Sequence, residues 1–286
     1  MENLVGKTAL ITGGASGIGL SVGKRLAESG MKVALADIEI PTLEKAVSEL
    51  KGPGLEVMGI HCDVSDLSSV EEMKNKVEET FGSPGVVCLN AGVGFGASIS
   101  EATIGDWEWV IGVNLWGIIN GLNSFLPALR EMNDGHIVIT ASIAGHISIP
   151  NLGPYNATKF AAVTIAETLR QELRVENSSV GVSCLCPGFV STNIWNSERN
   201  RPENLIKGSS FDLSDADLLQ REAFMEWIYA NAKQPSEVAE LVYEAIVNNH
   251  FWIFTDDQHI NAVKSRHSSI VTGDELPEPS PLITDL

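Results

Sequence analysis

Short runs of apolar, often β-branched residues alternate along the chain with longer segments in which apolar residues recur every three or four positions. The short runs predict strands and the longer segments predict amphipathic helices. The expected strands are residues 7–12, 32–37, 56–61, 86–90, 136–140, 180–186 and 251–254. The expected helices are residues 17–29, a helix from 41, 66–81, 103–130, 152–176 and 235–248. This alternation is typical of βαβ units, so we predict an α/β fold whose parallel sheet is covered on both faces.

The alternation is interrupted between residues 190 and 233. This stretch has no strand pattern and carries aromatic residues among polar ones, namely Trp195, Phe211, Phe224, Trp227 and Tyr229. We interpret it as a substrate lid inserted in a single dinucleotide-binding and catalytic domain of residues 1–254. Residues 255–286 are expected to form a tail, extended or disordered from Leu276 onward, where prolines alternate with polar residues.

Composition limits the possible partners. The chain has 286 residues, 44% of them hydrophobic, which is enough for one large core. Its 19 basic and 37 acidic residues give a net charge of −18, which argues against a nucleic-acid or anionic-membrane partner. No uninterrupted apolar run reaches the roughly 20 residues of a membrane helix, and the first residues do not resemble a signal peptide. The four cysteines lie in or beside apolar runs, so we expect reduced thiols, a cytoplasmic location and no metal site.

A glycine-rich loop follows the first expected strand and opens the first helix. It places Gly13, Ser16, Gly17, Ile18 and Gly19 where backbone N–H groups can approach a pyrophosphate at a helix N-terminus. The spacing is G-x-x-x-G-x-G, and not the G-x-G-x-x-G of many dehydrogenases. A tight turn without a ligand is the alternative interpretation, but the strand before the loop and the helix after it favour a dinucleotide.

Two later strands end in carboxylates. Asp37 can accept hydrogen bonds from both ribose hydroxyls of NAD and would repel the 2′-phosphate of NADP, so NAD is the expected cofactor. A helix-capping aspartate is the alternative. Asp63 and Val64 can flank an adenine, although a simple turn at the end of the strand explains them equally well.

Tyr155 and Lys159 stand four residues apart on an expected helix, so they share one face. With the stretches above, they resemble the short-chain dehydrogenase/reductase family in its compact one-domain form. The matching residues are Thr12, Gly13, Gly17, Gly19, Asp37, Asp63, Val64, Asn90, Ala91, Gly92, Asn114, Ser142, Tyr155, Lys159, Pro187, Gly188, Val190 and Thr192. One departure is Leu89, where the family often has a second asparagine. We expect it to change local strand packing without loss of activity.

The resemblance implies a Rossmann-like, doubly wound sheet of seven parallel strands in three α/β/α layers, with a bound nicotinamide dinucleotide. It implies a catalytic quartet of Asn114, Ser142, Tyr155 and Lys159. It also implies that Asn90 and Gly92 border the cofactor, and that Pro187, Gly188, Val190 and Thr192 hold its nicotinamide side. The family forms homodimers and homotetramers, often through helices equivalent to residues 103–130 and 152–176.

The chemistry of the quartet is consistent with this assignment. A free tyrosine has a pKa near 10, and an acid/base at neutral pH needs a value nearer ~7, which is about 4 kcal/mol of phenolate stabilisation. We expect the Lys159 ammonium and the positive nicotinamide ring to supply it. Ser142 can donate to the substrate oxygen. Asn114 lies within a helix, where a local kink and a bound water relaying protons to Lys159 would explain it.

The candidate substrate residues are Ser142, Ala144, His146, Asn151, Phe95, Phe189 and Trp195. Most are apolar, which predicts a hydrophobic secondary alcohol and its ketone. Residues 110–121 and 193–202 also resemble the family branch of the Cα-dehydrogenases, which act on aryl (benzylic) carbinols. A hydroxysteroid or terpenoid alcohol dehydrogenase is the alternative enzyme. A dinucleotide-sensing regulatory protein is the non-enzymatic alternative, although such proteins commonly lack the tyrosine or the lysine.

Overall fold

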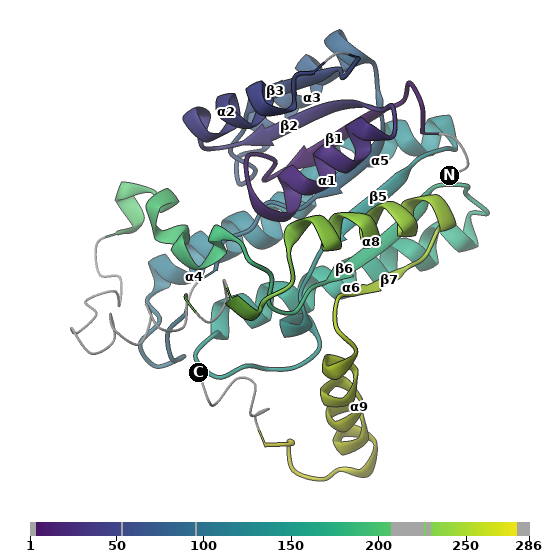
Figure 1. Cartoon of the computed structure of the whole chain (residues 1–286). Coiled ribbons are helices and arrows are strands. Elements are labelled where there is room, and N and C mark those ends of the chain that lie inside the picture. Colours follow the sequence, from purple (N-terminus) through teal and green to yellow (C-terminus); the bar gives the residue numbers. More distant parts are fainter. Residues whose placement is uncertain (1–3, 53, 95, 207–225, 227–229, 279–286) are drawn as a thin grey trace.

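The computed structural model describes residues 4–52, 54–94, 96–206, 226 and 230–278 of the chain (Figure 1). They contain a seven-stranded sheet of order β3-β2-β1-β4-β5-β6-β7. All neighbouring strands pair in parallel. The strands are β1 Thr8–Thr12, β2 Lys32–Asp37, β3 Val57–His61, β4 Pro84–Leu89, β5 His136–Thr140, β6 Gly181–Cys186 and β7 Trp252–Phe254. The predicted Rossmann-like doubly wound fold is confirmed, with all seven strands close to their expected positions.

Helices cover both faces of this sheet. They are α1 Gly17–Glu28, α2 Ile40–Leu50, α3 Leu67–Phe81, α4 Ile104–Ile111, α5 Gly117–Met132, α6 Gly153–Val175, α8 Pro235–Asn248 and α9 Asp257–Thr272. One buried apolar cluster joins α1, α2 and α8 to the sheet, and a second joins α3, α5 and α6 to its other face. Figure 1 shows α1 and α8 side by side on the same face. The arrangement therefore has the three expected layers.

Local sequence explains where several helices begin. Proline stands in the first turn of α2, α6 and α8, where its missing N–H costs no helical hydrogen bond. Asp66 caps α3 by accepting a hydrogen bond from the Ser68 N–H. Thr103 and Asp106 form a reciprocal capping box at the start of α4. These signals are short-range, so the starts of α2, α3, α4, α6 and α8 lie within a few residues of their predicted positions.

The long helix expected over residues 103–130 is not a single α-helix. A π-helical turn, Gly112–Trp116, separates α4 from α5, and Asn114 lies within it. Such turns are frequent at functional sites because the extra residue redirects a side chain. The stretch Ile104–Met132 is long and apolar enough to cross a membrane by length and composition alone. Half of its most apolar window is buried, and α5 packs against α3 and β4, as a core helix does.

Leu89 of β4 packs closely against α5. A side chain on Gly121 of α5 would overlap the Leu89 side chain, so the helix approaches the strand closely only because position 121 is glycine. The departure at Leu89 is therefore accommodated by a complementary small residue across the interface.

The region after β6 differs most from expectation. Within the segment expected as a lid, the described residues form a 3₁₀ segment, Asn193–Asn200, and a further turn, Glu203–Leu205. The aromatic residues Phe211, Phe224, Trp227 and Tyr229 lie outside the described residues. The region expected as a tail contains helix α9, which extends from the end of β7 at the margin of the molecule (Figure 1).

Candidate active site

A cleft runs along the carboxyl ends of the strands, where the order of the sheet reverses between β1 and β4. Open α/β sheets bind ligands at this switch point because two crossovers leave it on opposite faces. The expected cofactor residues that line the cleft are Gly13, Ser16, Gly17, Ile18, Asp37, Asp63, Val64, Asn90, Gly92, Tyr155, Lys159, Pro187, Gly188, Val190 and Thr192. The fold thus gathers residues from positions 13 to 192 along one surface.

The glycine loop forms the floor of one half of the cleft. Gly13 and Gly17 have φ values of +63° and +53°, which glycine adopts without strain. A Cβ at Gly19, which lies beneath the lining, would overlap the Gly13 carbonyl, so the loop is folded tightly onto the first turn of α1. A Cβ at Gly17 would lie 2.9 Å from Thr192 Cγ2. The absence of side chains at these glycines leaves space next to the N-terminus of α1. A pyrophosphate fits this space, because it could accept hydrogen bonds from the backbone N–H groups.

Asp37 at the end of β2 is held in place by the backbone. Its Oδ2 accepts a hydrogen bond from Ala15 N at 2.9 Å, and its Oδ1 accepts one from Glu39 N at 3.1 Å. These bonds join the carboxylate to the glycine loop and fix it at the rim of the cleft. The arrangement fits a ribose whose two hydroxyls donate to the remaining carboxylate lone pairs.

Thr12 and Asn90 support the centre of the cleft. Thr12 Oγ1 accepts hydrogen bonds from Asn90 N at 2.9 Å and Ala91 N at 3.1 Å. The Asn90 side chain donates to Thr12 O at 3.0 Å and accepts from Thr140 Oγ1 at 3.2 Å. The hydrogen bonds of Asn90 therefore tie the ends of β1, β4 and β5 together.

Ser142, Tyr155 and Lys159 meet on the other half of the cleft. Ser142 follows β5, whereas Tyr155 and Lys159 lie one turn apart on α6. The Ser142 hydroxyl hydrogen-bonds with Tyr155 and also reaches Pro187 O at 3.4 Å. Lys159 Nζ lies 5.5 Å from the centroid of the Tyr155 ring and donates to Thr140 O at 2.9 Å. A substrate oxygen at Tyr155 would therefore also be within reach of a second hydroxyl.

Asn114 is fully buried behind this group and does not line the cleft. Its Oδ1 accepts from Val93 N at 2.7 Å, and its Nδ2 donates to Val93 O at 2.9 Å and to Thr158 Oγ1 at 3.3 Å. A Cβ on Gly92 would lie 3.3 Å from Asn114 Oδ1 and 3.6 Å from Lys159 Nζ. The π-helical turn thus places the Asn114 side chain beside Gly92, which the Lys159 ammonium also approaches.

The pKa shifts that the protein's own groups cause at Tyr155 and Lys159 differ from the sequence expectation. Tyr155 borders the cleft and is only partly exposed, and burial raises its pKa to about 12, against an opposing hydrogen bond from Ser142. Burial lowers the pKa of Lys159 to about 8. The protein's own groups therefore keep the phenol neutral, and the expected pKa near 7 requires an additional positive charge beside it.

Not every expected substrate residue reaches the cleft. Ala144, Phe189 and Trp195 line it together with Ser142. His146 instead hydrogen-bonds Cys186 Sγ at 3.3 Å and packs with its ring against Trp252 and Phe254, so it supports the sheet edge.

Two further expectations about the pocket have different outcomes. Asn151 is exposed, has a φ of +59° and does not line the cleft. Phe95 lies outside the described residues.

The structure also places residues in the cleft that the sequence analysis missed. His259 and Ala262 of α9 lie there, and a Cβ on Gly188 would overlap the His259 ring. Glu39, Arg199 and Asn200 line the opposite end. In the sequence, residues 193–202 show only a resemblance to one family branch, and no local pattern shows that Arg199, Asn200 or the residues of α9 reach the cleft, because this depends on the packing of segments far apart in sequence.

A comparison with known families agrees with this geometry. The family model described as short chain dehydrogenase matches residues 7–203, which include the glycine loop, the quartet and the first part of the lid segment. The chain belongs to this family. It is therefore related to oxidoreductases, and the family assignment made from the sequence is confirmed.

Three relatives illustrate the range of this oxidoreductase family. A crystal structure of a short-chain dehydrogenase/reductase from Burkholderia phymatum in complex with NAD has a TM-score of 0.92 and 37% identity, covering 98% of this chain and 99% of that one. A C alpha-dehydrogenase of Sphingobium is 33% identical over 88% of this chain and 81% of its own length. A 1-deoxy-11-beta-hydroxypentalenate dehydrogenase of Streptomyces exfoliatus is 29% identical over 96% and 92%.

Proposed function

We propose that the protein is an NAD-dependent oxidoreductase that interconverts a hydrophobic secondary alcohol and its ketone by hydride transfer. The observation that carries this proposal is the meeting of Ser142, Tyr155 and Lys159 in one cleft with the glycine loop of Gly13 and Gly17. A dinucleotide-sensing regulator would have no use for the tyrosine and lysine, and the chain retains both.

In the oxidation direction, the Tyr155 phenolate removes the hydroxyl proton of the alcohol while the carbinol hydrogen leaves as hydride. NAD, when bound, supplies the hydride acceptor and a positive ring that favours the phenolate. Ser142 holds the substrate oxygen beside Tyr155. Lys159 adds a second positive charge one helical turn away, and Asn114 holds the Val93 backbone behind it. The products are a ketone, a reduced cofactor and a proton on Tyr155.

A preference for NAD over NADP is part of the proposal. Asp37 presents a carboxylate at the end of β2 that is fixed by two backbone hydrogen bonds. A 2′-phosphate there would meet like charge, whereas a ribose hydroxyl would find an acceptor. The similarity to a relative crystallised with NAD supports the same cofactor.

The substrate end of the cleft favours an apolar alcohol. Ile147, Ile149 and Leu152 line it, and the rings of Phe189 and Trp195 lie 6.4 Å apart. We propose an aryl carbinol, because the aromatic pair can pack against a flat ring and because a C alpha-dehydrogenase is among the relatives. A hydroxysteroid or terpenoid alcohol is the second candidate, favoured by the apolar lining and by the hydroxypentalenate dehydrogenase relative.

Replacing Tyr155 with phenylalanine tests the reaction. We expect Tyr155→Phe to lower kcat by about 100-fold or more, since a general acid/base contributes at least that much, with NADH affinity nearly unchanged. Turnover is followed by NADH absorbance with aryl, sterol and alicyclic secondary alcohols, and binding by NADH fluorescence. A variant that keeps more than a tenth of wild-type kcat would contradict the role of Tyr155.

We further propose a homodimer or homotetramer in the cytoplasm. Trp116 directly before α5, Met132 at the end of α5 and Val175 at the end of α6 are exposed apolar residues that an interface would cover. All four cysteines are buried and free, which suits a reducing compartment. Size-exclusion chromatography with light scattering tests the assembly, and a monomer at micromolar concentration would contradict it.

A further inference from the structure

Residues 193–205, which we call the strap, form one wall of the cleft and are tied to the rest of the protein at three places. Ser197 Oγ accepts a hydrogen bond from Gly94 N at 3.1 Å, after β4. Arg201 reaches Asp106 on α4, and Arg199 reaches Glu39 after β2. In the sequence, this stretch shows only a resemblance to one family branch. The contacts show that its polar residues join three different edges of the cleft.

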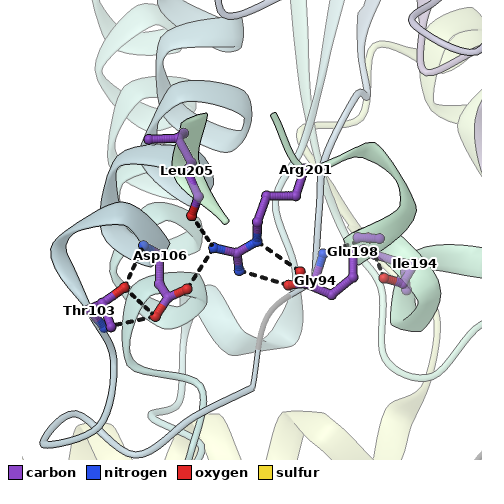
Figure 2. A network of polar contacts seen from close by, with 8 residues as sticks. Gly94, Thr103, Asp106, Ile194, Glu198, Arg201 and Leu205 are labelled. Atoms are coloured by element: carbon purple, nitrogen blue, oxygen red, sulfur yellow. Dashed lines mark hydrogen bonds and ion pairs between the residues drawn. The ribbon is translucent and has the colours of Figure 1, made fainter. Parts of the chain in front are cut away.

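The contact between Arg201 and Asp106, which we call the anchor of the strap, is a buried ion pair. The Arg201 guanidinium contacts Asp106 Oδ1 at 2.6 Å and Glu198 Oε1 at 2.7 Å (Figure 2). It also lies 4.4 Å from the centroid of the Trp109 ring. The Arg201 and Asp106 side chains are 1% and 0% exposed. Breaking this pair would leave a buried charge without its partner, which is strongly unfavourable. The end of the strap at Arg201 therefore stays attached to α4.

The Glu39 tie spans the opposite end of the cleft. Arg199 Nη2 lies 2.6 Å from Glu39 Oε1, and Asn200 Nδ2 donates to the same oxygen at 2.7 Å. Thr42 Oγ1 donates to Glu39 Oε2 at 3.1 Å and fixes the carboxylate from the other side. Glu39 follows Asp37 by two residues, and all of these except Thr42 line the cleft. The tie therefore crosses the cleft beside the carboxylate expected to hold the ribose.

The two ties differ in strength. The Arg199 and Glu39 side chains are 32% and 23% exposed, whereas the Arg201 anchor is buried. A partly exposed ion pair is screened by water and salt and contributes little to stability, so it opens far more readily than a buried one. Opening of the strap should therefore begin at Glu39 while Arg201 remains in place.

We propose that Glu39 and Arg199 form a latch across the adenosine end of the cleft, and that its opening controls the release of the dinucleotide. The proposal rests on the NAD binding proposed above. Neither residue touches the reacting atoms, so both are positioning residues. Their effect is on cofactor dissociation and on KM for NAD, and not on the hydride-transfer step.

Cofactor release measured by stopped flow tests the latch. NADH is displaced from the protein by excess NAD and its fluorescence is followed. We expect Glu39→Gln and Arg199→Gln to release NADH about 3- to 5-fold faster than wild type, as loss of a partly exposed ion pair implies. The charge-swapped double variant Glu39→Arg/Arg199→Glu should return the rate toward that of wild type. The wild-type release rate should rise with salt, whereas that of Glu39→Gln should not.

Glu240→Gln is the matched control. It removes an ion pair of the same 2.6 Å length, between Arg25 of α1 and Glu240 of α8, neither of which lines the cleft. Release from this variant should equal that from wild type. If Glu240→Gln accelerates release as much as Glu39→Gln does, or if Glu39→Gln leaves the rate unchanged, the latch is refuted.

Hydrogen–deuterium exchange of the ligand-free protein separates the latch from the cofactor assignment. We expect Glu39→Gln to speed exchange in peptides covering residues 193–200, with little change around Arg201 and α4. Unchanged exchange at residues 193–200 would overturn the latch. A wild-type protein that binds no NADH would refute the proposed function instead, and the exchange measurement would still decide whether the ion pair holds the strap.

Discussion

Replacing Arg201 with methionine tests the buried anchor of the strap most directly. The change keeps much of the apolar stem but removes the guanidinium, which leaves the Asp106 carboxylate 0% exposed and without its positive partner. Asp106 Oδ2 still accepts from Thr103 N at 2.7 Å and from Thr103 Oγ1 at 2.8 Å. Glu198 is 22% exposed and can turn toward water. The substitution therefore removes the ion pair of Asp106 Oδ1, while Oδ2 keeps its hydrogen bonds.

Removing one partner of a buried ion pair typically lowers the free energy of unfolding by about 3–5 kcal/mol. Because the hydrogen bonds from Thr103 to Asp106 remain, we expect Arg201→Met to lower it by about 3 kcal/mol. In a domain of this size, that corresponds to a Tm lower by roughly 5–10 °C. Urea and thermal unfolding followed by circular dichroism measure both quantities. The double variant Arg201→Met/Asp106→Asn should recover most of the loss, because it removes the buried charge and keeps an acceptor for Thr103.

The pH dependence of the same variant has a definite sign. Burial works to raise the pKa of Asp106, but hydrogen bonds from Thr103 and Arg201 hold it below its ordinary value of 3.8. A lowered pKa in the folded state stabilises the protein above the unfolded value, and this contribution is lost as the pH falls through the folded value. The difference in free energy of unfolding between wild type and Arg201→Met should therefore become smaller below about pH 4. A loss smaller than about 1 kcal/mol at neutral pH, or no recovery in the double variant, would refute this reasoning.

Two further predictions concern stability away from the cleft. Burial lowers the pKa of His136 from 6.5 to about 3, so the protein takes up a proton at this residue when it unfolds between these pH values. The free energy of unfolding should therefore fall as the pH drops from about 6.5 toward 3. In urea unfolding measured at a series of pH values, His136→Gln should show a weaker dependence on pH. Gly121→Ala should destabilise the protein by about 1–3 kcal/mol through overlap with Leu89. Gly121→Ala combined with Leu89→Ala should be destabilised by less than the sum of the two single variants, because the smaller side chain at position 89 removes the overlap. An unchanged Tm in Gly121→Ala would mean that α5 can shift away from β4.

Much of the fold follows from signals within short stretches of sequence. Period-2 and period-3.6 patterns located the strands and most helices, and proline and capping residues marked helix starts. The glycine loop, Asp37 and the Tyr155–Lys159 spacing could be recognised because their geometry depends on neighbours within one turn or one strand end. Helix α9 was missed because its apolar periodicity is weak, and many of its residues are exposed.

The electrostatics and the closure of the cleft depend on contacts between distant segments. Burial by the whole fold raises the pKa of Tyr155 and lowers that of Lys159, and their four-residue spacing carries no information about either shift. Arg201 meets Asp106 across 95 positions, and Arg199 meets Glu39 across an even longer separation.

Local patterns specify backbone conformation, because that depends on adjacent residues. Desolvation and ion pairing depend on which surfaces packing brings together, so the strap, its anchor and its latch emerge only in the folded chain.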